Sequence, residues 1–165
     1  IFRKPADSAE SSRHNAWMPD AAARPATPTR SDYRVFRSMP TRWMDNDAYG
    51  HVNNVVYYSY FDTAVNGWLM DATGTDIRQL PEIGLVVETS CRYLKPLSFP
   101  EELEVGIAME RVGNSSLVYR VAIFSAGAAE PAAHGRFVHV YVDSATRQSR
   151  PVPALIRRAV ESHLV

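Results

Sequence analysis

The sequence has one cysteine, no excess of either charge and no long uninterrupted apolar run. Cys91 has no second cysteine to pair with in the 165-residue chain, which excludes an internal disulfide framework and fits a reducing compartment. The 18 basic and 18 acidic residues balance, so nothing predicts bulk attraction to nucleic acid or to an anionic membrane. The most apolar stretch contains Asp62 and Asn66 and is too short and too polar to span a membrane. We therefore expect a cytoplasmic protein without nucleic acid or membrane partners.

The N-terminal part of the chain has no apolar period. Residues 1–31 are rich in Ala, Pro, Ser and Arg and contain few large apolar side chains that could anchor them. We expect this segment to be a mobile arm. The remaining residues, 32–165, have a length suited to one domain with an adequate but not large core.

A buried helix is predicted in the middle of the sequence, within the stretch Trp43 to Met70. From Val55 onward, apolar residues occupy every face of a helix of period 3.6, and only a few polar residues interrupt them. A helix that is apolar all round is typical of a protein interior. Gly74 is the stop signal expected at its C-terminus. The rest of the chain has to wrap this helix.

Segments with strand-like patterns flank the helix on both sides. The first, beginning at Tyr33, is interrupted by Pro40, which suits an edge strand or a bulge. Four more follow, at residues 83–94, 103–111, 117–124 and 135–142. The turn at residues 113–116 predicts that the middle pair forms a hairpin. The last 15 residues predict a short covering helix, so the chain as a whole predicts an α+β domain with a curved antiparallel sheet.

Polar residues gather just before the predicted helix. Asp47 stands there with Asp45, and Asn53 and Asn54 can accept hydrogen bonds from the first free backbone N–H groups. Gly50 allows a backbone conformation that other residues avoid. A carboxylate facing a helix N-terminus can act as general base or nucleophile on a carbonyl whose oxygen the N–H groups hold. The same residue types also serve as ordinary turn and cap residues, and residue types alone leave both interpretations open.

The remaining candidate groups have simpler explanations. His51 could carry a proton or orient an intermediate, although a lone histidine at a helix start is also a common structural residue. Cys91 sits in an apolar strand pattern, which favours a buried inert thiol over a nucleophile. His134 and His139 are five residues apart on a predicted strand and should face opposite sides of the sheet, so we expect no metal site.

The stretch RWMDNDAYGHVNNVVYYSYFD, residues 42–62, resembles the signature of the hotdog-fold acyl-CoA thioesterases, in particular the 4-hydroxybenzoyl-CoA thioesterase branch. The similarity continues through RYLKPL at 92–97, LEV at 103–105, VHVYVD at 138–143 and RPVP at 150–153. It covers residues 33–163. The resemblance implies a five-stranded antiparallel sheet wrapped around a long helix that starts near Asn54. It also implies homodimers whose sheets join, often paired into homotetramers, with each active site at the dimer interface.

The resemblance also implies roles for individual residues. Asp47 matches the catalytic aspartate of the family, and Asn54 falls at the helix start whose backbone N–H polarises the thioester carbonyl. The simplest benzoyl-CoA enzymes have D-P-A-G where this sequence has D-A-Y-G, so Tyr49 is expected to change the acyl pocket. The implied catalytic residues are Asp47, His51 and Asn54, and the implied substrate-binding residues are Tyr49, Gly50, Asn53 and Tyr57.

The activity that the resemblance implies is hydrolysis of an acyl thioester carried by CoA or by acyl carrier protein, without a cofactor. Two other functions remain open on the same fold. An enoyl-CoA hydratase would require a D-x-N-P-x-H stretch, whereas this sequence has D-x-D-x-x-G-H without the proline. A non-catalytic acyl-CoA binding protein is also compatible, because a fold does not determine a function.

Overall fold

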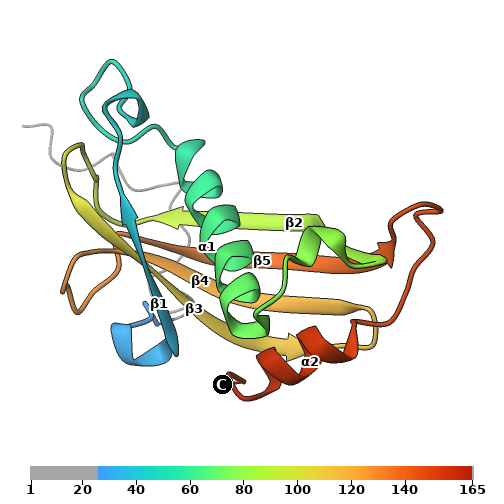
Figure 1. Ribbon diagram of the computed structural model, residues 1–165. Helices are drawn as coiled ribbons and strands as arrows, with labels where there is room; N and C mark the ends of the chain where they lie inside the picture. The colour runs from blue at the N-terminus through green and yellow to red at the C-terminus, as the bar shows by residue number, and fades with distance from the viewer. Residues whose placement is uncertain (1–25, 165) are drawn as a thin grey trace, which may run out of the picture.

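One long helix, α1 (Val56–Thr73), lies against one face of a five-stranded antiparallel sheet in the computed structural model, which describes residues 26–164 (Figure 1). The strands follow the spatial order β1-β3-β4-β5-β2. This arrangement confirms the predicted α+β class and the hotdog fold. The arm predicted for residues 1–31 falls mostly outside the described residues and stays a prediction. The other elements are η2 (Arg30–Asp32), β1 (Val35–Pro40), η3 (Trp43–Asp45), η4 (Ile77–Gln79), β2 (Glu82–Tyr93), β3 (Glu102–Val112), β4 (Ser116–Ser125), β5 (Ala133–Asp143) and α2 (Ala154–Glu161).

The core forms where α1 meets the sheet. Alternate residues of the central strands β3 and β4 point toward the helix, as the two-residue period of a strand requires. Phe61 and Leu69 of the helix are fully buried against strand residues such as Ile107 and Tyr119. In the single chain this wrapping is incomplete. The exposed residues of α1 are Ser59, Asp62 and Thr63, which share one side of the helix, and Asp71 and Ala72 in its last turn.

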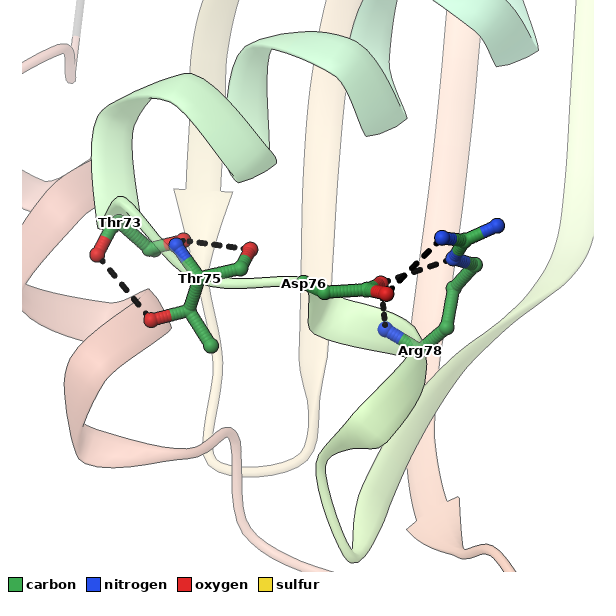
Figure 2. Close-up of polar contacts among 4 residues, drawn as sticks. All are labelled: Thr73, Thr75, Asp76 and Arg78. Carbon is green, nitrogen blue, oxygen red and sulfur yellow. Dashed lines mark hydrogen bonds and ion pairs between the residues drawn. The ribbon is translucent and has the colours of Figure 1, made fainter.

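The C-terminal end of α1 turns sharply onto β2. Gly74 has a φ of 62°, the left-handed conformation expected after a helix. Figure 2 shows how side chains secure this turn: the Thr75 hydroxyl donates to the Thr73 carbonyl at 3.3 Å, and Asp76 accepts from Arg78. The Arg78 guanidinium lies 2.8 Å from the Asp76 carboxylate and lowers its pKa to about 2.

The edge strand, the hairpin and the covering helix agree with the predictions. β1 is an edge strand and ends at Pro40. β3 and β4 pair as an antiparallel hairpin, and α2 buries Ile156 and Val160 against the core. Within residues 26–164, no helix is both long and apolar enough to cross a membrane.

A second, smaller apolar cluster covers the face of the sheet turned away from α1. Tyr33 and Phe36 pack edge-on against Phe124, with ring centroids 5.7 and 5.8 Å apart. The Arg30 guanidinium lies 4.1 Å from the Phe36 ring centroid and forms an ion pair of 2.8 Å with Glu104. These contacts hold the segment before β1 across this outer face.

Candidate active site

The loop between η3 and α1 folds back on itself before the helix begins. Asn46 and Val52 form an antiparallel bridge. Inside it, the Asp47 N–H donates to the His51 carbonyl at 2.8 Å, and the Gly50 N–H donates to the Asp47 carbonyl at 3.1 Å. Gly50 has a φ of 83°, which an L side chain rarely adopts. The loop is therefore a tight, hydrogen-bonded turn that holds Asp47 and His51 side by side.

The two aspartates of this loop have different environments. Asp45 is 1% exposed, forms a 2.8 Å ion pair with Arg42, and accepts a 2.7 Å hydrogen bond from the Tyr60 hydroxyl of α1. Burial alone would raise the pKa of Asp45, but the hydrogen bonds from Arg42 and Tyr60 together outweigh it and hold the pKa below its usual value. The Asp45 carbonyl also accepts from the Asn53 N–H at 2.8 Å. The Asp45 carboxylate therefore links the loop to α1, and both of its oxygens are already hydrogen-bonded within the protein.

Asp47 is less buried than Asp45 and accepts fewer hydrogen bonds. Its Oδ1 accepts from the Tyr49 N–H at 2.8 Å and, more weakly, from the His51 N–H at 3.4 Å. Both bonds go to the same oxygen, and no donor from residues 26–164 reaches Oδ2. The backbone therefore orients the carboxylate of Asp47 and leaves one oxygen available for chemistry.

The start of α1 offers an unused backbone donor. The Asn53 side chain accepts from the Val55 N–H at 3.1 Å, and its carbonyl accepts from the Val56 N–H at 2.9 Å. The prediction that both asparagines cap the helix is wrong in position: Val55 is the N-cap of α1, and Asn53 closes the turn just before it. The Asn54 N–H has no acceptor among residues 26–164. It is an exposed donor at the positive end of the helix dipole, which favours negative charge on a bound oxygen.

A cavity of about 300 Å³ opens beside this donor, and we call it the helix-start cavity. It is lined by His51, Asn54 and Tyr57, together with Tyr93 at the end of β2 and Lys95 just after it. The Tyr93 hydroxyl donates to the Asn54 carbonyl at 3.0 Å, and its ring packs edge-on against Tyr57 at 5.0 Å. Burial raises the pKa of Tyr57 to about 12, so its hydroxyl stays protonated at neutral pH.

The predicted site residues fall into two groups. His51, Asn54 and Tyr57 come together in the helix-start cavity, whereas Asp47 stands in the adjoining turn. Sequence reasoning did not assign Tyr93 or Lys95 to the site, although both belong to the RYLKPL motif. Besides Asp47, the predicted residues that do not line the cavity are Tyr49, which is 87% exposed, Gly50 and Asn53.

The remaining titratable candidates are separate from this site. His139 is buried on the α1 side of the sheet and His134 lines a cavity on the other side, as predicted for positions five apart. Burial raises the pKa of Cys91 to about 11, which keeps the thiol protonated. Within the part of the chain that the structure describes, no three His, Cys, Asp or Glu side chains cluster as metal ligands would.

Comparison with known proteins places this architecture in a family. Residues 41–160 match the model of the thioesterase-like superfamily. The chain belongs to this superfamily. The PA5185 protein of Pseudomonas aeruginosa strain PAO1 is 45% identical, with a TM-score of 0.81 over 84% of this chain and 97% of that one.

Two further proteins are less similar to this chain. A thioesterase from Thermus thermophilus, solved in complex with coenzyme A and Zn, is 27% identical, with a TM-score of 0.67 over 79% of this chain and 94% of that one. The YsmA protein of Bacillus subtilis strain 168 is 25% identical over 88 residues, 53% of this chain. That match spans only 59% of the length of YsmA.

Proposed function

We propose that this member of the thioesterase-like superfamily hydrolyses acyl-CoA thioesters at the start of α1. The observation that supports this most directly is the pairing of two free groups in one loop. Asp47 has an unused carboxylate oxygen, and seven residues later the Asn54 N–H has no acceptor from residues 26–164. A carboxylate and a backbone oxyanion donor carried by one loop are the minimal equipment for attack on a thioester carbonyl.

In the proposed reaction, the Asn54 N–H and the dipole of α1 hold the thioester carbonyl oxygen as negative charge develops on it. Asp47 acts in one of two ways. As general base it removes a proton from water, which attacks the carbonyl, and the C–S bond breaks to release the thiol. As nucleophile it forms a mixed anhydride with the acyl group, and water then cleaves the anhydride to the free acid.

The neighbouring residues take supporting roles in this proposal. His51 reaches the helix-start cavity and is available to hydrogen-bond the substrate or the departing sulfur. Gly50 keeps the turn in its left-handed conformation, and Asn53 holds the first turn of α1 so that the Asn54 N–H points free. Tyr57 lines the cavity, and in this proposal the exposed Tyr49 ring contacts the substrate outside it.

The free edge of β2 supports a homodimer. Its side chains Leu85, Val86 and Val87 are 37%, 45% and 60% exposed, and the strand is 12 residues long. A long exposed apolar edge normally pairs or is covered. We propose that two copies join β2 to β2 across a two-fold axis, which makes one continuous sheet, and that such dimers can pair again into a homotetramer.

Antiparallel pairing of the two β2 strands would bring different cavities together. The start of one β2 would lie beside the end of the other. A second cavity, of about 330 Å³, lies at the start of β2 and is lined by Leu69, Ile83 and Ile156. This strand-start cavity of one copy would adjoin the helix-start cavity of the partner. We propose that it receives the acyl chain, so that each active site needs both copies.

The carrier of the acyl group is proposed from the comparison with the Thermus thermophilus thioesterase that was solved with coenzyme A. An acyl carrier protein thioester is the alternative carrier. We propose a cytoplasmic location, which agrees with the single, partly buried cysteine of the chain.

The test is release of free thiol from a panel of short, long, branched and aromatic acyl-CoAs. Asp47→Asn should lower kcat by at least about a hundredfold, the typical contribution of one general base. Asp71→Asn is the matched control, because this exposed carboxylate pairs with Arg37 at the far end of α1. Near-normal turnover by Asp47→Asn would refute the assignment, and saturable acyl-CoA binding without turnover would identify a binding protein instead. Hydration of an enoyl-CoA without thiol release would identify a hydratase.

A further inference from the structure

The outer face of the sheet carries a second polar cavity, of about 550 Å³, which we call the outer-face cavity. Arg92, Arg120, His134 and Arg136 line it, together with Tyr33 from the segment before β1. Arg120 stands between Tyr119 and Val121, which both point into the core under α1. Its side chain therefore points to the opposite side of the sheet. The outer-face cavity is separated from the candidate active site by the sheet itself.

The strand register places like charges directly opposite one another. Arg120 of β4 is the cross-strand partner of Arg136 of β5, so two guanidinium groups are directly opposed, and Arg92 of β2 lies two residues further along, opposite His134 of β5. Like charges in directly opposed positions destabilise a sheet. No helix or turn geometry requires this arrangement, so a ligand that neutralises the charge would explain why the sheet carries it.

The positive charge is only partly balanced by carboxylates. Arg136 forms ion pairs with Glu88 at 3.0 Å and Glu110 at 3.3 Å. Arg92 and Arg120 have no carboxylate within 4.0 Å among residues 26–164. Asp32 is close enough to Arg120 to feel its charge, but its carboxylate accepts hydrogen bonds from the backbone and hydroxyl of Thr29.

The pKa of His134 is set by its position in the outer-face cavity. Burial lowers the pKa of His134, and the charges of Arg92 and Arg120 lower it further. The imidazole is therefore neutral at pH 7 and can donate a hydrogen bond to an anion without adding to the repulsion. The cavity thus presents two uncompensated guanidinium groups and one neutral donor.

We propose that the outer-face cavity binds a phosphate-bearing small molecule of nucleotide size. Guanidinium groups match phosphate oxygens in charge and in their paired N–H geometry. The volume lies within the range of small-molecule sites, about 300–1,000 Å³. Tyr33, whose ring centroid lies 5.9 Å from the Arg120 guanidinium, and Pro28 make part of the cavity lining apolar, which suits the non-phosphate part of such a ligand.

Two sources can supply this chemistry: a free nucleotide, or the adenosine phosphate end of CoA itself. The first experiment is isothermal titration of the full chain with ADP and with adenosine 3′,5′-bisphosphate, with uncharged adenosine as the negative probe. We expect saturable binding of the phosphorylated compounds, at least tenfold weaker in Arg120→Gln and in Arg92→Gln. Arg158→Gln, which removes an exposed arginine of α2, should bind as the wild type does. Absence of saturable binding to the wild type, or equal binding by all variants, would overturn the proposal.

A stability measurement separates a binding role from a structural one. Because Arg120→Gln removes one of two opposed like charges, the ligand-free variant should melt at the same temperature as the wild type or higher. The rise in melting temperature caused by ADP should be lost. A clear fall in the ligand-free melting temperature would indicate that Arg120 holds the sheet together and would overturn the proposal.

The two sources differ in their effect on catalysis. If the ligand is the nucleotide end of CoA, Arg92→Gln and Arg120→Gln should also raise the KM for acyl-CoA. If it is a free nucleotide, KM should stay unchanged while ADP binding is lost. Both outcomes retain the phosphate site, and the titrations need no acyl substrate, so failure of the proposed thioesterase activity would leave this test intact.

Discussion

The buried imidazole of His139 makes the stability of this protein depend on pH above the range in which carboxylates titrate. His139 is 2% exposed and lies among the rings of Phe137, Tyr119 and Tyr141, at centroid distances of 5.1, 5.5 and 6.3 Å. Its polar contact in this surrounding is the Tyr119 hydroxyl, 3.4 Å from Nδ1. Burial lowers the pKa of His139 from 6.5 to about 4, because the charged form loses its hydration.

The direction of the effect follows from where the proton binds. In the unfolded chain the imidazole takes up a proton below pH 6.5, whereas in the folded chain it does so only below about 4. The stabilisation that the neutral form provides is therefore complete above pH 6.5 and is lost as the pH falls toward 4. The full difference corresponds to about 3 kcal/mol, and about 2 kcal/mol of it is lost between pH 7.5 and 5. For a chain of this size that is a fall of about 4–8 °C in Tm.

The assay is urea unfolding at pH 7.5, 6.5, 5.5 and 5.0, with His139→Gln beside the wild type. Glutamine is of similar size and keeps a partner for the Tyr119 hydroxyl, so comparison of the pH slopes removes most of any packing cost. The variant should lose about 2 kcal/mol less than the wild type over this range. His163→Gln is the matched control and should keep the wild-type slope, because His139 is intact. His134 contributes in the same direction in all three proteins. An unchanged slope in His139→Gln would refute the reasoning.

Three further substitutions test the site and the dimer. Tyr60→Phe removes the 2.7 Å donor to the buried Asp45 carboxylate and should cost about 1.5–3 kcal/mol in urea unfolding, whereas Tyr49→Phe, on an 87% exposed ring, should cost little; equal costs would contradict a fastening role for Asp45. Val87→Asp should give monomers in sedimentation and lose thioesterase activity, while Ala145→Asp in an exposed turn should do neither; an active monomer would show that one copy suffices. Ile83→Trp should fill the strand-start cavity, lower kcat/KM for long acyl-CoAs at least tenfold and spare the shortest ones; an unchanged chain-length profile would place the acyl group elsewhere.

Elements with strong periodicity could be predicted closely from the sequence. The helix runs from Val56 to Thr73, ends before Gly74 as expected, and the later strands begin and end within about two residues of their predicted limits. Periodicity succeeds here because burial on one face imposes it. The strand order β1-β3-β4-β5-β2 was not predicted, apart from the β3–β4 hairpin, because alternation says which face is buried and not which strand lies beside which.

The candidate site was less predictable, because its residues differ in contacts and not in type. Asp45 and Asp47 are both aspartates, two positions apart. Only Asp45 accepts a hydrogen bond from the Tyr60 hydroxyl, fifteen residues later in the chain. Tyr93 reaches Asn54 across 39 residues because β2 ends beside the helix start. No local pattern records such contacts.

The backbone donor proposed for catalysis shows the same limit. Asn53 and Asn54 are chemically identical, and a sequence pattern assigns both to the helix cap. In the structure, Asn53 accepts hydrogen bonds from the backbone N–H groups of Val55 and Val56. The Asn54 N–H has no acceptor from residues 26–164 and lies at the positive end of the helix dipole. The group that we propose to stabilise the oxyanion is thus created by its neighbour's hydrogen bonds. Asn54→Ala should therefore retain most of the activity, because the N–H remains, whereas Asn53→Ala should lower kcat by releasing the turn that exposes it.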